Sequence, residues 1–256
     1  MADARETMLP DLIARIAKGD RHAFDALYQA TSARLNAVCL SILRDRREAE
    51  EALEQTYIAV WKTARDAGRG GLSPTAWLIA TARDVALAQA SAMTPPAAGD
   101  FSRPAQAVRG AYLQGLDLDA FADSAGIPPA AARQRLHEGL GELGADGSPD
   151  DLLAADLALG LLTGPDADAA RMRASQDADL ARRVRVWQER FTGFADDLTP
   201  VMAPARARQR IRESLGHGLA PLSVDPLERR PLWRGPGGIL TAVLLAAAIG
   251  WFVWGA

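Results

Sequence analysis

Residues 73–83 read Ser-Pro-Thr-Ala-Trp-Leu-Ile-Ala-Thr-Ala-Arg, and this stretch shows how the chain is built. A serine can accept a hydrogen bond from a free N–H group at a helix start, and proline suits the first helical position. Apolar side chains then recur at helical spacing; they are Trp77, Leu78, Ala82 and Val85. The pattern predicts a helix that begins at Pro74 and carries one apolar face.

The segments on both sides repeat this pattern. Apolar residues follow a helical period in residues 9–16, 23–43 and 47–62, and again in residues 130–143, 152–162, 165–174 and 180–191. Aromatic residues are only 6% of the 256 residues, and alanine is frequent throughout. This composition favours helices and argues against a β-sandwich or barrel. We therefore predict an all-α protein.

Turn-forming residues divide the chain at residues 94–100 and 144–149, which are rich in proline and glycine. These breaks predict a domain at 1–93, a linker at 94–103, a domain at 104–143, a linker at 144–150 and a domain at 151–215. A proline-containing juxtamembrane linker at 216–236 then leads to the last segment, 237–256.

That last segment reads GGILTAVLLAAAIGWFVWGA and contains no charged residue. Twenty residues form a helix of about 30 Å, which matches the apolar thickness of a bilayer. Arginines precede it at 229, 230 and 234, which places the N-terminal bulk in the cytoplasm by the positive-inside rule. We expect a single-pass inner-membrane protein that contacts lipid through residues 237–256. A buried core helix is the alternative.

Residues 10–91 resemble region 2 of extracytoplasmic-function (ECF) sigma factors, the promoter-specificity subunits of RNA polymerase. The resemblance is carried by residues 12–20 (LIARIAKGD), 23–28 (AFDALY), 42–46, 49–53, 57–61 and 73–83. It implies a helical bundle that docks on RNA polymerase through Asp45, Glu50, Glu51, Tyr57 and Trp61. It also implies that Trp77 and Arg83 meet promoter DNA. A solvated helix face is the alternative for the glutamates.

Residues 104–143 resemble region 4 of the same family, a small helix-turn-helix. Tyr112, the turn at 126–128 and the helix 130–143 carry the likeness, which implies that Arg133 and Arg135 contact promoter DNA. However, residues 84–91 contain no cation, and residues 94–150 hold 4 basic against 8 acidic residues. Because phosphate neutralisation supplies most non-specific affinity, we expect weak DNA binding. A plain helical linker domain is the alternative.

Residues 151–215 resemble the cytoplasmic domain of single-pass anti-sigma factors of the K type. The likeness is carried by residues 158–162, 165–174, 184–190, 198–201 and 204–215, followed by the apolar segment. It implies an anti-sigma helical bundle that contacts a sigma factor, and the candidate interface residues are Leu159, Leu162, Trp187 and Phe191. The internal core of the bundle is the alternative place for Trp187.

Catalytic and metal-binding patterns are missing from the sequence. The single cysteine, Cys39, excludes an intrachain disulfide and any zinc site with two thiolates. His22, His137 and His217 lie far apart, and no nucleotide-binding, metalloprotease or serine-hydrolase motif occurs. We expect a protein that is not an enzyme and has no cofactor and no small-molecule substrate.

The sequence thus leads to one main hypothesis. It is a membrane-anchored regulator of transcription initiation, in which an anti-sigma domain sequesters an ECF sigma factor, either its own module or a partner. The first alternative is a functional ECF sigma factor that directs RNA polymerase to promoters after release from its fused anti-sigma domain. The second is a membrane-anchored helical scaffold unrelated to transcription.

Overall fold

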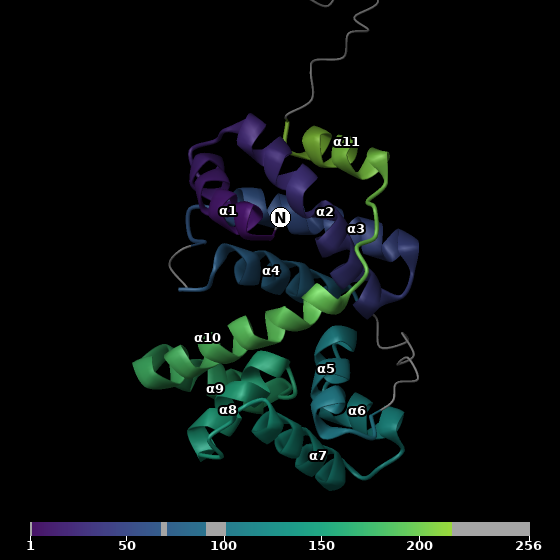
Figure 1. Cartoon of the computed structure of the whole chain (residues 1–256), viewed down its shortest axis with the longest axis vertical. Coiled ribbons are helices and arrows are strands. Elements are labelled where there is room, and N and C mark those ends of the chain that lie inside the picture. Colours follow the sequence, from purple (N-terminus) through teal and green to yellow (C-terminus); the bar gives the residue numbers. More distant parts are fainter. Residues whose placement is uncertain (1, 68–70, 91–100, 217–256) are drawn as a thin grey trace, which may run out of the picture. The chain divides into compact units, whose positions relative to one another are not determined.

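The computed structural model describes residues 2–67, 71–90 and 101–216, and every regular element in these residues is a helix (Figure 1). The all-α class is therefore confirmed for this part of the chain. In order, the elements are α1 (Ala2–Ile16), α2 (Arg21–Leu43), α3 (Arg46–Thr63), α4 (Pro74–Gln89), α5 (Pro104–Gln114), α6 (Leu118–Ala125), α7 (Pro129–Glu142), α8 (Pro149–Leu159), α9 (Gly164–Gln176), α10 (Ala178–Thr192), the 3-10 helix η1 (Gly193–Asp197) and α11 (Ala205–Ser214).

Side-chain caps explain where the helices begin. The Ser73 hydroxyl accepts a hydrogen bond from the backbone N–H of Ala76 at 3.2 Å, and Pro74 follows it as the first residue of α4. Asp20, Asp45 and Asp177 cap α2, α3 and α10 in the same way. Each cap satisfies N–H groups that have no partner inside the helix.

One predicted helix is too long. The apolar run 152–162 predicts a helix to Leu162, whereas α8 ends at Leu159. Gly160 adopts a left-handed backbone with φ of 84° and closes the helix through its N–H to the Asp156 carbonyl. A glycine reaches this conformation without steric cost, so it outweighs the apolar pattern.

The buried apolar side chains form two clusters. The first belongs to α1–α4, which we call the N-terminal bundle; its largest fully buried members are Phe24, Leu27, Leu35, Leu43, Leu53, Tyr57, Leu78 and Ile79. The second joins α5, α6, α7, α8 and α10; its largest fully buried members are Phe121, Leu136, Trp187 and Phe191. The second cluster runs across the predicted linker 144–150, so helices on both sides of that linker share one core.

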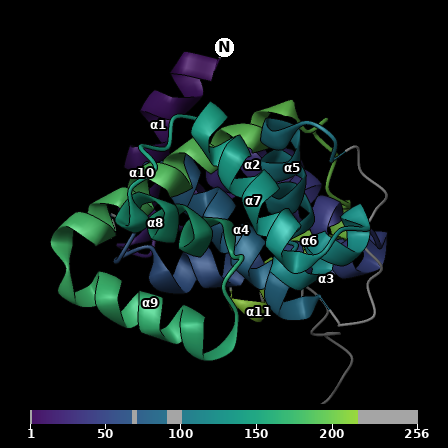
Figure 2. The ribbon, with the colours of Figure 1, turned by 90° about the horizontal axis from the view of Figure 1, so that it is seen from below.

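Residues 178–214 pass from the second cluster to the first, and we call them the covering segment. Its first helix, α10, packs against α8 and also against α4. The preceding helix α9 lies beside α8 and α10 (Figures 1 and 2). Residues 193–204, here the strap, then lead to α11, which packs against α3. Ala195 of the strap and Ile211 of α11 are buried in the first cluster.

In residues 2–67, 71–90 and 101–216, no helix is both long enough and apolar enough to cross a membrane. The predicted membrane segment 237–256 lies outside the described residues, as do residues 94–100 of the first predicted linker and 217–236 of the juxtamembrane linker.

Candidate functional site

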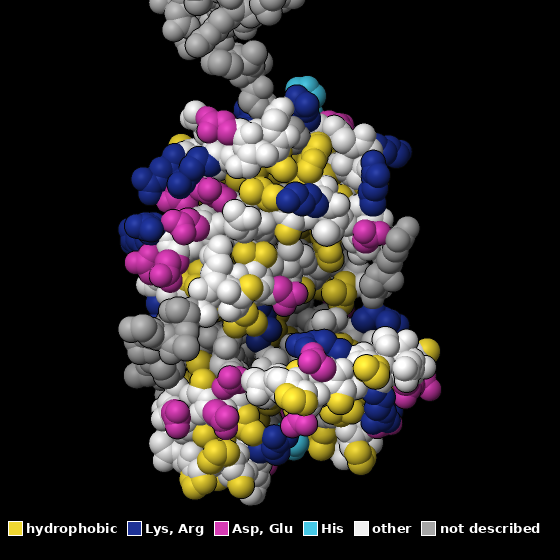
Figure 3. Space-filling model, turned by 180° about the vertical axis from the view of Figure 1, so that it is seen from behind, with side chains coloured by type: hydrophobic (Ala, Val, Ile, Leu, Met, Phe, Trp, Pro, Cys, Tyr) yellow, Lys and Arg dark blue, Asp and Glu magenta, His cyan; other side chains and the backbone are white. Residues whose placement is uncertain are grey.

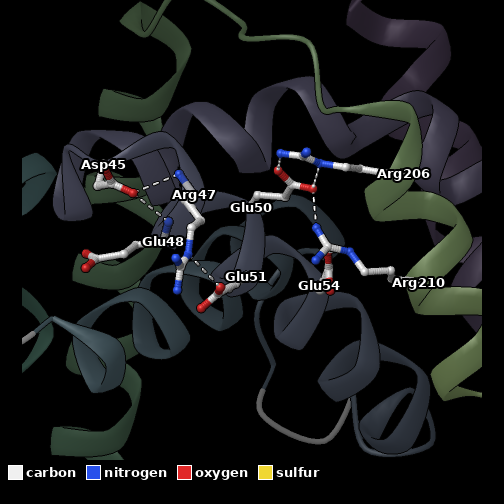
Figure 4. A network of polar contacts seen from close by, with 8 residues as sticks. All are labelled: Asp45, Arg47, Glu48, Glu50, Glu51, Glu54, Arg206 and Arg210. Atoms are coloured by element: carbon white, nitrogen blue, oxygen red, sulfur yellow. Dashed lines mark hydrogen bonds and ion pairs between the residues drawn. The ribbon is translucent and has the colours of Figure 1, made fainter.

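The most specific polar contact between distant parts of the chain joins α11 to α3. Glu50 of α3 is 2% exposed, and its carboxylate receives Nε and Nη2 of Arg206, each at 2.7 Å. Arg210 also donates to Glu50, and its Nε lies 2.8 Å from Glu54 (Figure 4). A bidentate arginine–carboxylate pair combines charge with fixed geometry, so α11 is held in one register on α3.

The spacing of residues along α11 explains this docking. Arg206 and Arg210 are four residues apart and therefore share one face of the helix. Ala207 and Ile211, one position further along, are both buried. Arg208 reaches α2, where its Nη2 lies 3.2 Å from Asp25. α11 is thus a short basic helix with a small apolar stripe, and it covers an acidic patch formed by Asp25, Glu50 and Glu54.

Ionisation in the patch follows from these contacts. Hydrogen bonds from Arg206 hold the pKa of Glu50 below its ordinary value, although burial opposes this. Burial raises the pKa of Glu54, against the attraction of Arg210. Burial also raises the pKa of Tyr28, whose hydroxyl is buried and has no hydrogen-bond partner among the described residues. The patch is therefore partly dehydrated, which strengthens its ion pairs.

The other residues predicted to contact polymerase lie in different surroundings. Asp45 caps α3, and the exposed Glu51 pairs with Arg47 at 3.3 Å, on the part of α3 that lies away from Arg206 in Figure 4. Tyr57 is fully buried, and its hydroxyl lies 2.6 Å from that of Thr31. Trp61 is partly buried, and the centre of its ring lies 5.4 Å from the centre of the Phe24 ring. Tyr57 therefore belongs to the core of the bundle.

The strap is fastened to α2 by backbone and side-chain bonds. The Val201 N–H donates to the carbonyl of Ala33 at 3.0 Å, and Asn36 Nδ2 donates to the carbonyl of Val201 at 3.2 Å. Arg34 of α2 forms an ion pair with Asp196. Through these contacts the strap, which lies between α10 and α11 in the chain, is held against α2 of the bundle.

Arg83, for which the family resemblance implies a contact with DNA, is buried on α4. Its Nη2 donates to the Leu159 carbonyl at 2.6 Å, its Nε donates to the Tyr112 carbonyl at 3.3 Å, and its guanidinium stacks 4.6 Å from the Tyr112 ring centre. Burial lowers the pKa of Arg83. In this arrangement the guanidinium joins α4 to α5 and α8, and it is only 7% exposed.

The start of α4 is also held by the covering segment. The Ser73 hydroxyl donates to Glu189 of α10 at 2.8 Å, and the Ser73 N–H donates to the same carboxylate. Trp77, in the first turn of α4, is partly buried against the first cluster. The start of α4 and its interior residue Arg83 thus both contact helices that come later in the chain.

The predicted DNA-contacting arginines of α7 have partners inside the chain. Arg133 lies 3.5 Å from Asp156, and Arg135 Nη1 donates to the Phe101 carbonyl at 3.4 Å. On the face drawn in Figure 3, basic and acidic side chains are intermixed. A nucleic-acid footprint would gather cations on one surface, and the face in Figure 3 lacks such a gathering.

Three of the four candidate anti-sigma residues, Leu159, Trp187 and Phe191, pack within the second cluster. Leu159, Trp187 and Phe191 are buried and Leu162 is partly exposed. The Trp187 indole N–H donates to Asp151 at 3.0 Å. The centres of the Phe191 and Tyr112 rings lie 5.5 Å apart. Trp187 therefore takes the core position that the sequence left as its alternative.

The residues that connect the covering segment to the bundle were not among the sequence candidates. They are Arg206, Arg208 and Arg210 of α11, Glu189 of α10, and Asp196 and Val201 of the strap. The available signal was the charge complementarity between residues 206–210 (RARQR) and residues 48–54 (EAEEALE). Within the described residues, no three His, Cys, Asp or Glu side chains group as metal ligands.

Comparison with known proteins connects part of the chain to transcription. No protein-family profile matches the chain, and no solved structure matches it. The chain is 37% identical over 78 residues to the ECF RNA polymerase sigma factor SigK of Mycobacterium ulcerans, which is 30% of this chain and 42% of that protein. It is 36% identical over 76 residues to SigK of Mycobacterium sp. (strain KMS), and 32% identical over 74 residues to SigK of Mycobacterium bovis.

The chain spans only about two fifths of the length of these curated relatives. The shared segment is nevertheless homologous to an ECF RNA polymerase sigma factor. About 30% of this chain is therefore related to ECF RNA polymerase sigma factors, and that part suggests a role in transcription regulation.

Proposed function

We propose that this chain is a regulator of transcription initiation in which a sigma-like bundle is kept inactive by its own covering segment. The observation that carries the proposal is the occupancy of Glu50. This residue resembles a polymerase-contacting glutamate of ECF sigma factors, and here it is enclosed by Arg206 and Arg210. A partner that needs the acidic patch has to displace α11 first.

RNA polymerase core is the partner that we propose for the patch. The relatives are named as RNA polymerase sigma factors, and α11 itself illustrates the chemistry the patch accepts. That chemistry is a helix with arginines four residues apart beside a short apolar stripe. A basic helix of the polymerase would satisfy the same carboxylates.

Promoter DNA is the second proposed partner, and we expect its binding to be weak. The burial of Arg83 supports this expectation because the guanidinium is held by two backbone carbonyls. Arg133 and Arg135 have intramolecular partners as well. Release of the covering segment would leave Arg83 bound to these carbonyls, which belong to α5 and α8, and the helix beyond Arg83 offers no further cation up to residue 91.

The proposed inhibition acts on the chain's own bundle rather than on a separate sigma factor. Support comes from the contacts of α10, the strap and α11, which all join residues of one chain. A tethered segment acts at an effective concentration in roughly the millimolar range. The anti-sigma function is thus proposed as self-inhibition, and a functional sigma factor that is released by cleavage or displacement is the alternative.

We further propose that residues 237–256 anchor the chain in the inner membrane, with the bundle in the cytoplasm. The support is the uncharged apolar run of 20 residues and the arginines before it.

Capture of polymerase from cells tests the proposal. Tagged full chain and its Arg206→Ala/Arg210→Ala variant are expressed in the native host, and the captured proteins are probed for polymerase core subunits. We expect little polymerase with the native chain and clear enrichment with the variant. Absence of polymerase from both captures would contradict the proposed function.

A further inference from the structure

A cavity of about 390 Å³ lies where the strap meets the N-terminal bundle. Small-molecule sites typically have volumes of about 300–1,000 Å³, so the cavity can hold a small ligand. Helices α1, α2 and α4 supply one side and the strap supplies the other. The lining residues on which the argument depends are Leu9, Arg34, Leu35, Leu78, Asp196 and Leu198.

Most of the wall is apolar. Leu9, Leu35 and Leu78 come from three helices of the bundle, and Leu198 comes from the strap. Each methylene of an alkyl chain that enters such a cavity is removed from water, which favours binding. The wall therefore favours a ligand with a short alkyl chain.

One end of the cavity carries a guanidinium with spare hydrogen-bonding capacity. Arg34 pairs with Asp196, which is itself 64% exposed. The Nε of Arg34 is buried and has no hydrogen-bond partner among the described residues. An unpaired buried donor is unfavourable, and an acceptor that reaches it once Asp196 has turned away removes that cost.

We propose that this cavity binds a small aliphatic carboxylate, with its alkyl chain among the leucines and its carboxylate on Arg34. A carboxylate matches the planar fork of a guanidinium and can accept from two of its nitrogens at once. The ligand carboxylate takes the place of Asp196, whose exposed side chain can turn to solvent at little cost. A neutral amphiphile of the same length would gain the apolar contacts but not the charge.

Such a ligand touches both the bundle and the strap. Because it binds only where these two surfaces meet, it stabilises the arrangement in which the strap is docked. Its binding does not depend on the proposed function. Its effect on polymerase rests on that function, since a docked strap keeps α11 on the acidic patch.

Calorimetric titration of the full chain with octanoate tests the proposal. All variants are titrated under the same conditions. Non-specific uptake of octanoate is then equal for all of them and does not affect the comparison. We expect saturable binding to the native chain and binding at least about tenfold weaker for Arg34→Gln, since the variant loses the charge-assisted hydrogen bonds to the ligand carboxylate. Ala30→Phe, which fills the cavity from α2, should also abolish binding.

Matched controls come from a second arginine–aspartate pair. Arg109 lies 3.3 Å from Asp197, with side-chain exposures close to those of Arg34 and Asp196, but neither residue lines the cavity. Arg109→Gln and Asp197→Asn should leave octanoate binding unchanged. Asp196→Asn should tighten it several-fold, because it removes the group that competes for Arg34.

Amide exchange at Val201 provides a second readout of the same complex. Octanoate should slow exchange of this N–H, which bonds to Ala33. The proposal is overturned if octanoate does not bind, if Arg34→Gln and Ala30→Phe bind it as well as the native chain, or if 1-octanol binds equally tightly. None of these measurements involves polymerase, so their failure is separate from failure of the proposed function.

Discussion

The guanidinium of Arg83 on α4 donates from Nη2 to the carbonyl oxygen of Leu159, the last residue of α8, at 2.6 Å. The final carbonyls of a helix have no partner inside it, and a cation placed there is favoured by the helix dipole. Nε of the same side chain binds the Tyr112 carbonyl of α5. One buried arginine thus ties the N-terminal bundle to two helices of the second cluster.

Replacement of this arginine should loosen that connection. Arg83→Met keeps the length of the side chain but leaves the Leu159 and Tyr112 carbonyls without their donor. We expect the free energy of unfolding in urea to fall by about 1–3 kcal/mol. Arg173→Ala, which removes an exposed ion pair to Asp150, should change it by less than about 1 kcal/mol. A methionine variant as stable as the native chain would show that the buried charge contributes nothing net.

Replacement of two glycines of α7 by alanine should change the free energy of unfolding in opposite directions. A Cβ at Gly139 would lie 2.2 Å from the backbone oxygen of Pro104, so α5 and α7 would have to separate. Nothing lies within 4 Å of a Cβ at Gly141. We expect Gly139→Ala to lower the free energy of unfolding by about 1–3 kcal/mol and Gly141→Ala to raise it by about 0.5–1 kcal/mol. Equal effects at both positions would contradict the close packing of α5 and α7.

Trp187 should behave as a core residue of the second cluster. Trp187→Phe removes the indole donor to Asp151 and should lower the free energy of unfolding by about 1–2 kcal/mol. Trp187→Ala also removes a large buried ring and should cost about 3–5 kcal/mol. Urea unfolding followed by circular dichroism measures both. A Trp187→Ala variant within 1 kcal/mol of the native chain would exclude the core role.

The docking of α11 should depend on pH through Glu50. Its pKa is lowered by Arg206 when α11 is docked, so the charged form favours docking. This contribution is fully present above the ordinary pKa of 4.5 and is lost as the pH falls through the lowered pKa. Glu54 acts in the opposite sense, because burial raises its pKa and protonation favours the docked state.

Amide exchange in α11, corrected for intrinsic rates, measures this dependence. In a Glu54→Gln background, protection of α11 should decline as the pH falls below 4.5. Glu50→Gln in the same background should give weaker protection that no longer declines over this range. Protection that is independent of pH in both proteins would show that Glu50 does not hold α11.

Local signals explain how much of the fold could be predicted. Helical periodicity and the Ser73–Pro74 start signal identify α4. The end of α8 was missed because an apolar pattern continues past Gly160, whose backbone conformation is a local property that periodicity does not report.

The site was less predictable because it depends on contacts between residues far apart in the chain. Glu50 and Arg206 are separated by 156 residues, and no periodicity links them. A family resemblance gives a residue such as Arg83 the role of the corresponding exposed residue in the family. It does not show that another segment of the same chain covers that residue. Tyr57 shows the same limit, since its burial follows from packing against Phe24 and Thr31.

The affinity of purified RNA polymerase core for the full chain tests the central claim most directly. If α11 occupies the patch, polymerase binds only the fraction of molecules in which α11 has left, and its apparent dissociation constant rises accordingly.

Arg206→Ala/Arg210→Ala removes the ion pairs to Glu50 and Glu54 without altering the patch. Arg212→Ala is the matched control, because this arginine of the same helix has no ion pair among the described residues. We predict binding at least about tenfold tighter for the double variant than for the native chain and the control, corresponding to about 1.4 kcal/mol of docking free energy. Equal affinity for all three proteins would contradict the claim that the covering segment blocks the sigma-like bundle.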